Sequence, residues 1–207
     1  MAVRAGQADD VVLRGLTFAG GREARRAVLV NTVNSLHIEN CVIHGFTSGG
    51  ISFLNDSAAN RLFVKDTIFR GNGGPSLHFQ PVAGKLAVTI DNCRLEDSGV
   101  GLLSLGGGTV IAMRDSVVAG NRSAGLALEG DSEINIDNCM VSNNGTVGID
   151  VRNGALARVS NSTITNNVVA GLFNNGFAPG TLETRGNNTV RGNDKDILGT
   201  VTTISAK

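Results

Sequence analysis

The chain has 207 residues, with 18 basic and 18 acidic side chains, 28 Gly and neither Trp nor Tyr. A net charge of zero and a low aromatic content are not typical of nucleic-acid-binding proteins, so we expect no nucleic-acid partner. Hydrophobic residues make up 41% of the chain, which is enough to form a core. No apolar run approaches the roughly 18 residues of a membrane span. We therefore expect one folded domain over residues 1–207, without a membrane span.

A phrase of six residues recurs along the chain, as in Ile38–Ile43, Ile90–Leu95 and Ile136–Val141. We call its third position the anchor, which is Asn or Asp in most copies. The anchors are, in chain order, Gly15, Asn40, Asp66, Asn92, Asp115, Asn138, Asn161 and Asn187. Successive anchors are separated by 23 to 26 residues, which indicates a repeat architecture.

Each repeat has the polarity pattern of short strands. The positions two before and three after the anchor are almost always apolar, and polarity mostly alternates between them. A further strand is predicted about ten residues after the anchor, for example over 50–53, 76–79, 125–128 and 148–151. Each repeat is therefore expected to contain two or three strands and no helix.

The length of the repeat fits a β-solenoid. About 23 residues at roughly 3.3 Å each give a contour near 76 Å, enough for a three-sided coil whose strands pair in parallel with neighbouring coils. Neither the hexapeptide steps of a left-handed β-helix nor the Leu pattern of a leucine-rich repeat is present. The sequence predicts an all-β, single-stranded parallel β-helix of about eight coils, with 23–26 residues per coil.

The anchor residues are expected to form a sharp turn, because Asn and Asp tolerate the left-handed backbone conformation. Their stacked side chains could form a ladder along the axis, at about 4.8 Å per step. A second, shorter ladder is predicted six residues later, at Asn72, Asn121, Asn144, Asn167 and Asn193.

Two further columns of equivalent positions have regular chemistry. The residues before the anchor, Glu39, Lys65, Asp91, Arg114 and Asp137, alternate in charge and predict a solvated stripe of salt bridges. The cysteines, Cys41, Cys93 and Cys139, follow the anchor in alternate coils, about 9.6 Å apart. At that separation we expect buried thiols without a disulfide or a metal cluster.

The repeat phrase, Ile-x-Asn-Cys/Ser-x-Ile followed by Asn-Asn-x-x-x-Gly-Ile/Leu, resembles that of right-handed parallel β-helix proteins of the pectate-lyase-like superfamily. It is most similar to a large group of uncharacterised bacterial members, over roughly residues 10–198. The resemblance implies a right-handed coil, and a secreted or cell-surface location for the full-length protein. It specifies the fold and not the chemistry.

Enzymes of that superfamily place acidic and basic side chains on one outer face. The matching candidates for a catalytic stack are His44, Arg70 and Glu96, each four residues past the anchor in consecutive coils. A histidine could abstract a proton there while the arginine stabilises an anion. A simple surface ion pair is the alternative explanation for these residues.

A second candidate set, for ligand binding, lies on the other predicted strand. It comprises His78, Glu129, Asp150 and Arg152, with Phe177 in a loop that has no obvious core role. No metal site is predicted, and no cofactor is expected unless the protein is a lyase, in which case Ca²⁺ is implied. The residues that polygalacturonase-type hydrolases carry are absent.

These observations favour a non-catalytic β-helical scaffold or binding module that contacts carbohydrate or protein at the cell surface or outside the cell. The alternative is a polysaccharide lyase or glycoside hydrolase that acts on an acidic polysaccharide. Residues 1–10 are expected to be a frayed or truncated start, and residues 199–207 a C-terminal strand or cap. Uncapped strand edges would favour end-to-end or side-by-side self-association.

Overall fold

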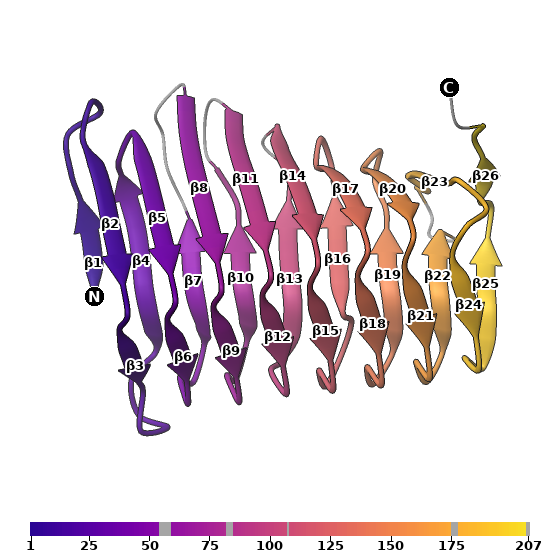
Figure 1. Ribbon diagram of the computed structural model, residues 1–207, viewed down its shortest axis with the longest axis horizontal. Helices are drawn as coiled ribbons and strands as arrows, with labels where there is room; N and C mark the ends of the chain where they lie inside the picture. The colour runs from indigo at the N-terminus through magenta and orange to yellow at the C-terminus, as the bar shows by residue number, and fades with distance from the viewer. Residues whose placement is uncertain (54–58, 82–84, 107, 175–177, 206–207) are drawn as a thin grey trace.

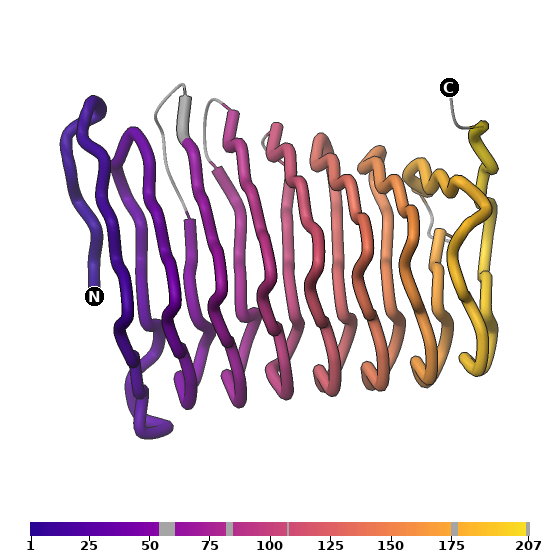
Figure 2. Tube along the Cα trace, viewed as in Figure 1, coloured from indigo at the N-terminus to yellow at the C-terminus, as the bar shows by residue number. Residues whose placement is uncertain are grey.

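The computed structural model describes residues 1–53, 59–81, 85–106, 108–174 and 178–205. All regular elements assigned there are β-strands, which form three parallel sheets around one axis (Figure 1). The coils are stacked along the long axis, with the two termini at opposite ends (Figure 2). The prediction of an all-β parallel solenoid is confirmed. No described helix is long and apolar enough to cross a membrane.

Each complete coil contributes one strand to each of three sheets, here called A, B and C, and β25 (Lys195–Gly199) and β26 (Thr202–Thr203) add a last strand to sheets A and B. Sheet A contains β1 (Ala2–Arg4), β4 (Arg26–Thr32), β7 (Gly49–Phe53), β10 (Pro75–Phe79), β13 (Val100–Leu105), β16 (Leu126–Glu129), β19 (Val147–Val151), β22 (Ala170–Asn174) and β25 (Lys195–Gly199). Sheet B contains β2 (Asp10–Arg14), β5 (Ser35–Glu39), β8 (Ala59–Lys65), β11 (Lys85–Asp91), β14 (Thr109–Arg114), β17 (Glu133–Asp137), β20 (Leu156–Ser160), β23 (Thr181–Thr184) and β26 (Thr202–Thr203). Sheet C contains β3 (Thr17–Ala19), β6 (Val42–His44), β9 (Ile68–Arg70), β12 (Arg94–Glu96), β15 (Val117–Ala119), β18 (Met140–Ser142), β21 (Thr163–Thr165) and β24 (Thr189–Arg191).

The eight strands of sheet C follow the eight anchors, so the repeat phrase spans the end of a sheet B strand and the start of a sheet C strand. The terminal segments also contain strands, because β1 pairs with β4 and β26 pairs with β23.

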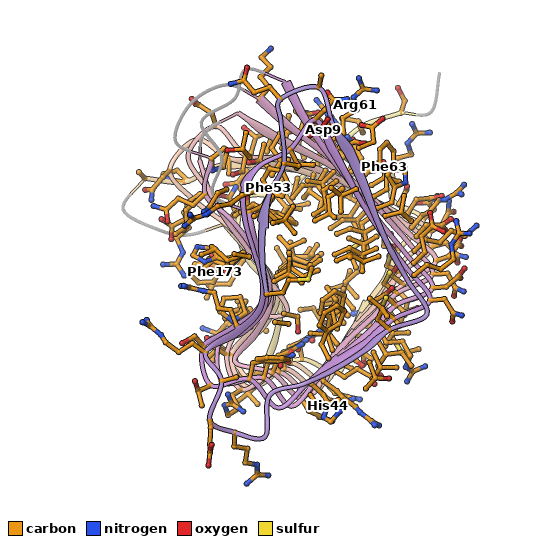
Figure 3. The ribbon with its side chains drawn as sticks, turned by 90° about the vertical axis from the view of Figure 1, so that its left-hand side faces the viewer. Asp9, His44, Phe53, Arg61, Phe63 and Phe173 are labelled. Atoms are coloured by element: carbon orange, nitrogen blue, oxygen red, sulfur yellow. The ribbon has the colours of Figure 1, made fainter. Side chains whose placement is uncertain are left out.

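The core fills the space enclosed by the three sheets. The two apolar columns that flank the anchor are buried from the second to the seventh coil, as Ile38 and Ile43 illustrate. Phenylalanines from two sheets, Phe53, Phe79 and Phe69, are fully buried between them, and Phe53 lies inside the coil in Figure 3. Full burial of such a side chain stabilises the fold by about 1.5–3 kcal/mol. In the first coil, Leu13 and Phe18 are only partly buried.

The anchor forms the turn from sheet B to sheet C. From Asn40 to Asn161 all six anchors are left-handed, with φ between 49° and 51°, as predicted from their residue types. The last coil differs from the prediction, because Gly186, with φ of 76°, takes the left-handed conformation one residue before Asn187. Glycine has no Cβ that opposes this conformation, so the turn can move there.

The anchor side chains are exposed, and their mutual hydrogen bonds join them in pairs, which corrects the expectation of a continuous ladder at this column. Asn92 Nδ2 donates to Asp66 Oδ1 at 2.6 Å, and Asn138 Nδ2 makes the same contact with Asp115. Asn187 Nδ2 donates to Asn161 Oδ1 at 2.8 Å.

The continuous ladder is the predicted second one, six residues after the anchor, and it lies inside the coil. Each amide donates to the next along the axis, from Asn121 to Asn144 at 3.0 Å, then to Asn167 and Asn193 at 2.9 Å each. The same oxygens accept backbone N–H groups of the preceding coil. Asn72 is joined to this column through Ser98, whose N–H donates to Asn121 Oδ1. The asparagine ladder thus satisfies polar groups that the turn buries.

The pairing of anchors makes a charge-sensitive prediction. Asn92→Asp would place a second carboxylate against Asp66, where the amide now donates, and remove an attractive contact. Because the site is exposed, we expect a loss of about 1 kcal/mol at pH 7. Asp66→Asn should change stability less. Melting temperatures at pH 7 and pH 4 test this: the deficit of Asn92→Asp should shrink at pH 4, where carboxylates take up protons, and equal melting temperatures at pH 7 would contradict it.

The predicted stripe of alternating charges forms only some of the expected ion pairs. Arg114 makes two hydrogen bonds to Asp91, of 3.1 Å and 3.0 Å, across adjacent strands. Glu39 instead pairs with Arg14 in the preceding coil, with 2.6 Å between Oε2 and Nη2. Lys65 has no ion pair among the residues that the structure describes.

The three cysteines are free and buried at equivalent positions, and hydroxyl side chains occupy this column in the intervening coils. The N–H of Cys93 donates to Ser116 Oγ at 3.0 Å, and that of Cys139 donates to Ser162 Oγ at 3.1 Å. Burial raises the pKa of the Cys93 thiol to about 12. This thiol is therefore protonated at neutral pH and fills the core as a small apolar group.

Candidate anion-binding groove

The turn from sheet C to sheet A has its own left-handed column, five residues after the anchor. Successive members are Gly45, Gly71, Asp97, Gly120, Asn143, Asn166 and Gly192, with φ between 50° and 74°. This column was not predicted, although Gly, Asn or Asp follows each sheet C strand from the second coil onward in the sequence. Gly45 and Gly71 occupy this position in two consecutive coils. Because they have no side chains, they leave a depression on the outer surface of the turn.

Two adjoining hollows of about 260 and 520 Å³ lie over these glycines. Both are lined by Arg22, Gly45, Gly71 and Asp97, so they form one groove along the edge between sheets C and A. A Cβ built on Gly71 would meet no heavy atom within 4 Å, because it would point into open space. The arginine groove, as we call it, is lined by Arg22, His44, Gly45, Phe46, Thr47, Arg70, Gly71, Gly73, Asp97 and Arg122.

Basic residues from separate coils reach this groove. Arg70 ends β9, and Arg22 lies in the turn after β3 with a left-handed φ of 64°, where its N–H donates to Gly45 O at 2.8 Å. Arg122 follows β15, and its Nη2 donates to Asn72 O at 3.0 Å and to Gly73 O at 2.8 Å. These contacts fix the Arg122 guanidinium over the turn of the third coil.

The charge of the groove is positive. The ion pairs found between described residues include none of Arg22, Arg70 and Arg122. Asp97 is the single carboxylate among the lining residues. Guanidinium groups present a planar fork of donors that matches carboxylates, sulfates and phosphates. The arrangement can therefore hold an anionic group.

The predicted stack of His44, Arg70 and Glu96 is in register. His44 is paired with Arg70, and Arg70 with Glu96, on consecutive strands of sheet C. His44 and Arg70 line the groove, and Figure 3 places His44 on the outside of the coil. Glu96 forms an ion pair at 2.5 Å with Arg94 on its own strand and is not among the lining residues. The comparison of equivalent repeat positions could not predict this ion pair, because Arg94 and Glu96 lie two and four residues past the anchor.

The second predicted set lies on sheet A and is not brought together as a whole. His78 and Asp150 share one outer column, but the residues Leu103 and Ala127 of two intervening strands separate them. Burial lowers the pKa of His78, and the charge of Arg26 adds to this effect. Phe177 lies outside the described residues.

Asp150 and Arg152 of this second set do meet. Asp150 is 2% exposed and accepts hydrogen bonds from Arg152 Nε at 2.8 Å and 2.9 Å. The Arg152 guanidinium carbon lies 6.0 Å from the centroid of the Phe173 ring. Glu129 accepts a hydrogen bond from Asn153 at 3.2 Å. Asp150 and Arg152 are therefore held together by their own hydrogen bonds. In the described part of the chain, no three His, Cys, Asp or Glu side chains are placed to hold a metal ion.

Comparisons with known proteins identify the family of this chain. Residues 82–196, more than half of the chain, match the model of the right-handed beta helix region. Among solved structures, the chain is similar to the A-module of mannuronan C-5 epimerase AlgE6 from Azotobacter vinelandii, at 16% identity and a TM-score of 0.49. That alignment covers 94% of this chain but only 65% of the other. A search of curated proteins finds no match. The repeat, the three parallel sheets and the family match together place this chain in the right-handed β-helix family.

Proposed function

We propose that the protein is a β-helical binding module that holds an acidic carbohydrate chain in the arginine groove. The observation that carries this proposal is the convergence of Arg22, Arg70 and Arg122 on a glycine-floored groove, without carboxylate partners among the described residues. Charge-assisted bonds to guanidinium groups are worth more than neutral ones, and they favour a ligand with carboxylates.

The extent of the groove favours a polymer over a single small anion. Its lining residues come from five consecutive coils, from Arg22 to Arg122. Arg22 and Arg70 are two coils apart, which is roughly 10 Å along the axis at about 4.8 Å per coil. The Arg122 guanidinium reaches back to the third coil. An extended polyuronate carries a carboxylate on every sugar and can reach several of these arginines together. Such ligands belong to cell surfaces and extracellular matrices, which is where we propose that the module acts.

The test measures binding of oligogalacturonate and oligomannuronate hexamers by isothermal titration calorimetry, with cellohexaose as the neutral comparison. We expect binding of an acidic hexamer that weakens as NaCl is raised, because counter-ions screen the arginines. Arg122→Ala and Arg70→Ala should each weaken the affinity by about tenfold, which is about 1.4 kcal/mol.

Arg114→Ala is the matched control, because Arg114 is also an exposed arginine but is paired with Asp91 on sheet B and does not line the groove. Its affinity should remain close to that of the unaltered protein. Equal binding of cellohexaose, or an equal loss in Arg114→Ala, would contradict the proposal.

His44 beside Arg70 favours a second candidate function, a polysaccharide lyase. The imidazole would remove the C5 proton next to the uronate carboxylate, and the arginine would stabilise the resulting anion. The C4–O glycosidic bond would then break to form the C4–C5 double bond, and the leaving oxygen would take a proton from water. The same hexamers, incubated with and without Ca²⁺, should then yield unsaturated uronides that absorb in the ultraviolet. Cleavage that His44→Ala abolishes would establish the lyase, and binding without cleavage would establish the binding module.

A further inference from the structure

A second pocket lies on the outer face of sheet B, away from the arginine groove. It has a volume of about 400 Å³ and lies over β17 and β20. One wall is formed by the last coil, where Ile204 N–H donates to Thr184 O at 2.8 Å and so holds the C-terminal segment along β23. Arg185 is a further lining residue from this coil. The pocket is thus built from residues that are far apart in the sequence.

A carboxylate is fixed in this pocket. Asp137 Oδ1 accepts hydrogen bonds from Ser160 Oγ and Asn161 Nδ2, both at 2.7 Å. These two bonds lower the pKa of Asp137, so its side chain stays charged under mildly acidic conditions. Both bonds end on Oδ1, and none of the hydrogen bonds among described residues uses Oδ2. The second oxygen can therefore accept from a ligand.

A guanidinium is fixed beside it. Arg158 Nε donates to Glu183 Oε2 at 2.9 Å, and its Nη1 forms an ion pair with Glu133. Arg158 lines the pocket between these two acids, so its position is set before any ligand arrives. Asp137 is the single carboxylate among the lining residues, and Glu133 and Glu183, which lie outside the lining, already balance the charge of Arg158. An anion would therefore meet Asp137 beside a guanidinium that is paired with two acids. An anion is disfavoured here, in contrast to the arginine groove.

We propose that this pocket binds a neutral sugar ring through neighbouring hydroxyl groups. A hydroxyl both donates and accepts, so adjacent hydroxyls can donate to Asp137 and accept from Arg158 or Arg185. Half-buried Ile204 offers an apolar surface for the C–H face of the ring. The pocket volume lies in the range of small-ligand sites. The proposal does not rest on the function of the arginine groove.

The experiment follows the methyl resonance of Ile204 in protein labelled at isoleucine methyl groups, during titration with cellohexaose, mannohexaose and xylohexaose. We expect at least one hexasaccharide to shift this resonance in a saturable manner. Asp137→Asn should weaken that binding at least fivefold, because it removes the charge but keeps an oxygen for Ser160 and Asn161. Arg185→Ala, at an exposed position, is an independent variant with the same expected direction.

Asp91→Asn is the matched control, since Asp91 lies two coils earlier at the equivalent position of sheet B and pairs with Arg114. Arg122→Ala separates this pocket from the arginine groove. Both variants should bind the neutral hexasaccharide normally. No shift of Ile204 with any of the three sugars would overturn the proposal. So would equal losses in Asp91→Asn and Asp137→Asn, or loss of binding in Arg122→Ala.

Discussion

Asn144→Ala is expected to lower the free energy of unfolding by about 3–5 kcal/mol. The Asn144 side chain is fully buried and accepts both the backbone N–H of Asn121, at 3.2 Å, and Asn121 Nδ2, at 3.0 Å. It also donates to Asn167 Oδ1 at 2.9 Å and to Val118 O at 3.4 Å. Alanine would leave several buried polar groups without partners, at about 1–3 kcal/mol each. The urea concentration at the unfolding midpoint measures the loss.

Asn138→Gly is the matched control for the ladder. Asn138 is an exposed anchor in the same coil, and glycine keeps its left-handed conformation, with φ of 51°, while removing the amide. We expect a loss below about 1 kcal/mol, because an exposed hydrogen bond is exchanged for water. If both variants unfolded at the same urea concentration, the inner ladder would have no special role in stability.

Gly74→Ala should prevent the third coil from packing on the second. A Cβ on Gly74 would lie 1.7 Å from the backbone oxygen of Ser48 and 2.8 Å from its carbonyl carbon. A backbone carbonyl that belongs to a stacked coil cannot move alone, so the two turns must separate. We expect a loss of about 4 kcal/mol or more, seen as a large fall in melting temperature or as insoluble protein.

Gly71→Ala is the corresponding control, three residues earlier in the same turn. A Cβ at Gly71 meets nothing within 4 Å, and only its left-handed conformation, with φ of 62°, opposes the change. The cost should be about 1–2 kcal/mol. A Gly74→Ala protein as stable as Gly71→Ala would show that the coils can slide apart at this turn.

The sequence was sufficient to predict the coil, because the same physical demand recurs in every repeat. A sharp turn favours Asn or Asp at the anchor, and a closed core favours apolar residues on either side of it. Residue types could not reveal which asparagine column faces inward. The anchor amides lie on the outside of their turn, whereas those six residues later lie inside the next turn, where their bonds are protected from water.

The candidate site was predictable only in part. The register of His44, Arg70 and Glu96 follows directly from counting past the anchor. The groove also needs Arg22 and Arg122, which both lie seven residues past an anchor but four coils apart. The Arg122 side chain reaches a backbone about 50 residues earlier. The direction in which a long side chain extends does not repeat from coil to coil. The repeat pattern therefore cannot predict this contact.

The spacing of the anchors has a consequence for how such a chain can change length during evolution. Three successive steps, from Asn92 through Asp115 and Asn138 to Asn161, are each 23 residues, and each strand pairs only with its counterparts in the adjacent coils. Deleting or duplicating one such unit would join chain ends that already occupy equivalent positions. A gain of a single residue inside a strand would turn every later side chain of that strand to the opposite face. The protein can therefore gain or lose whole coils, or residues in its surface loops, while keeping its core.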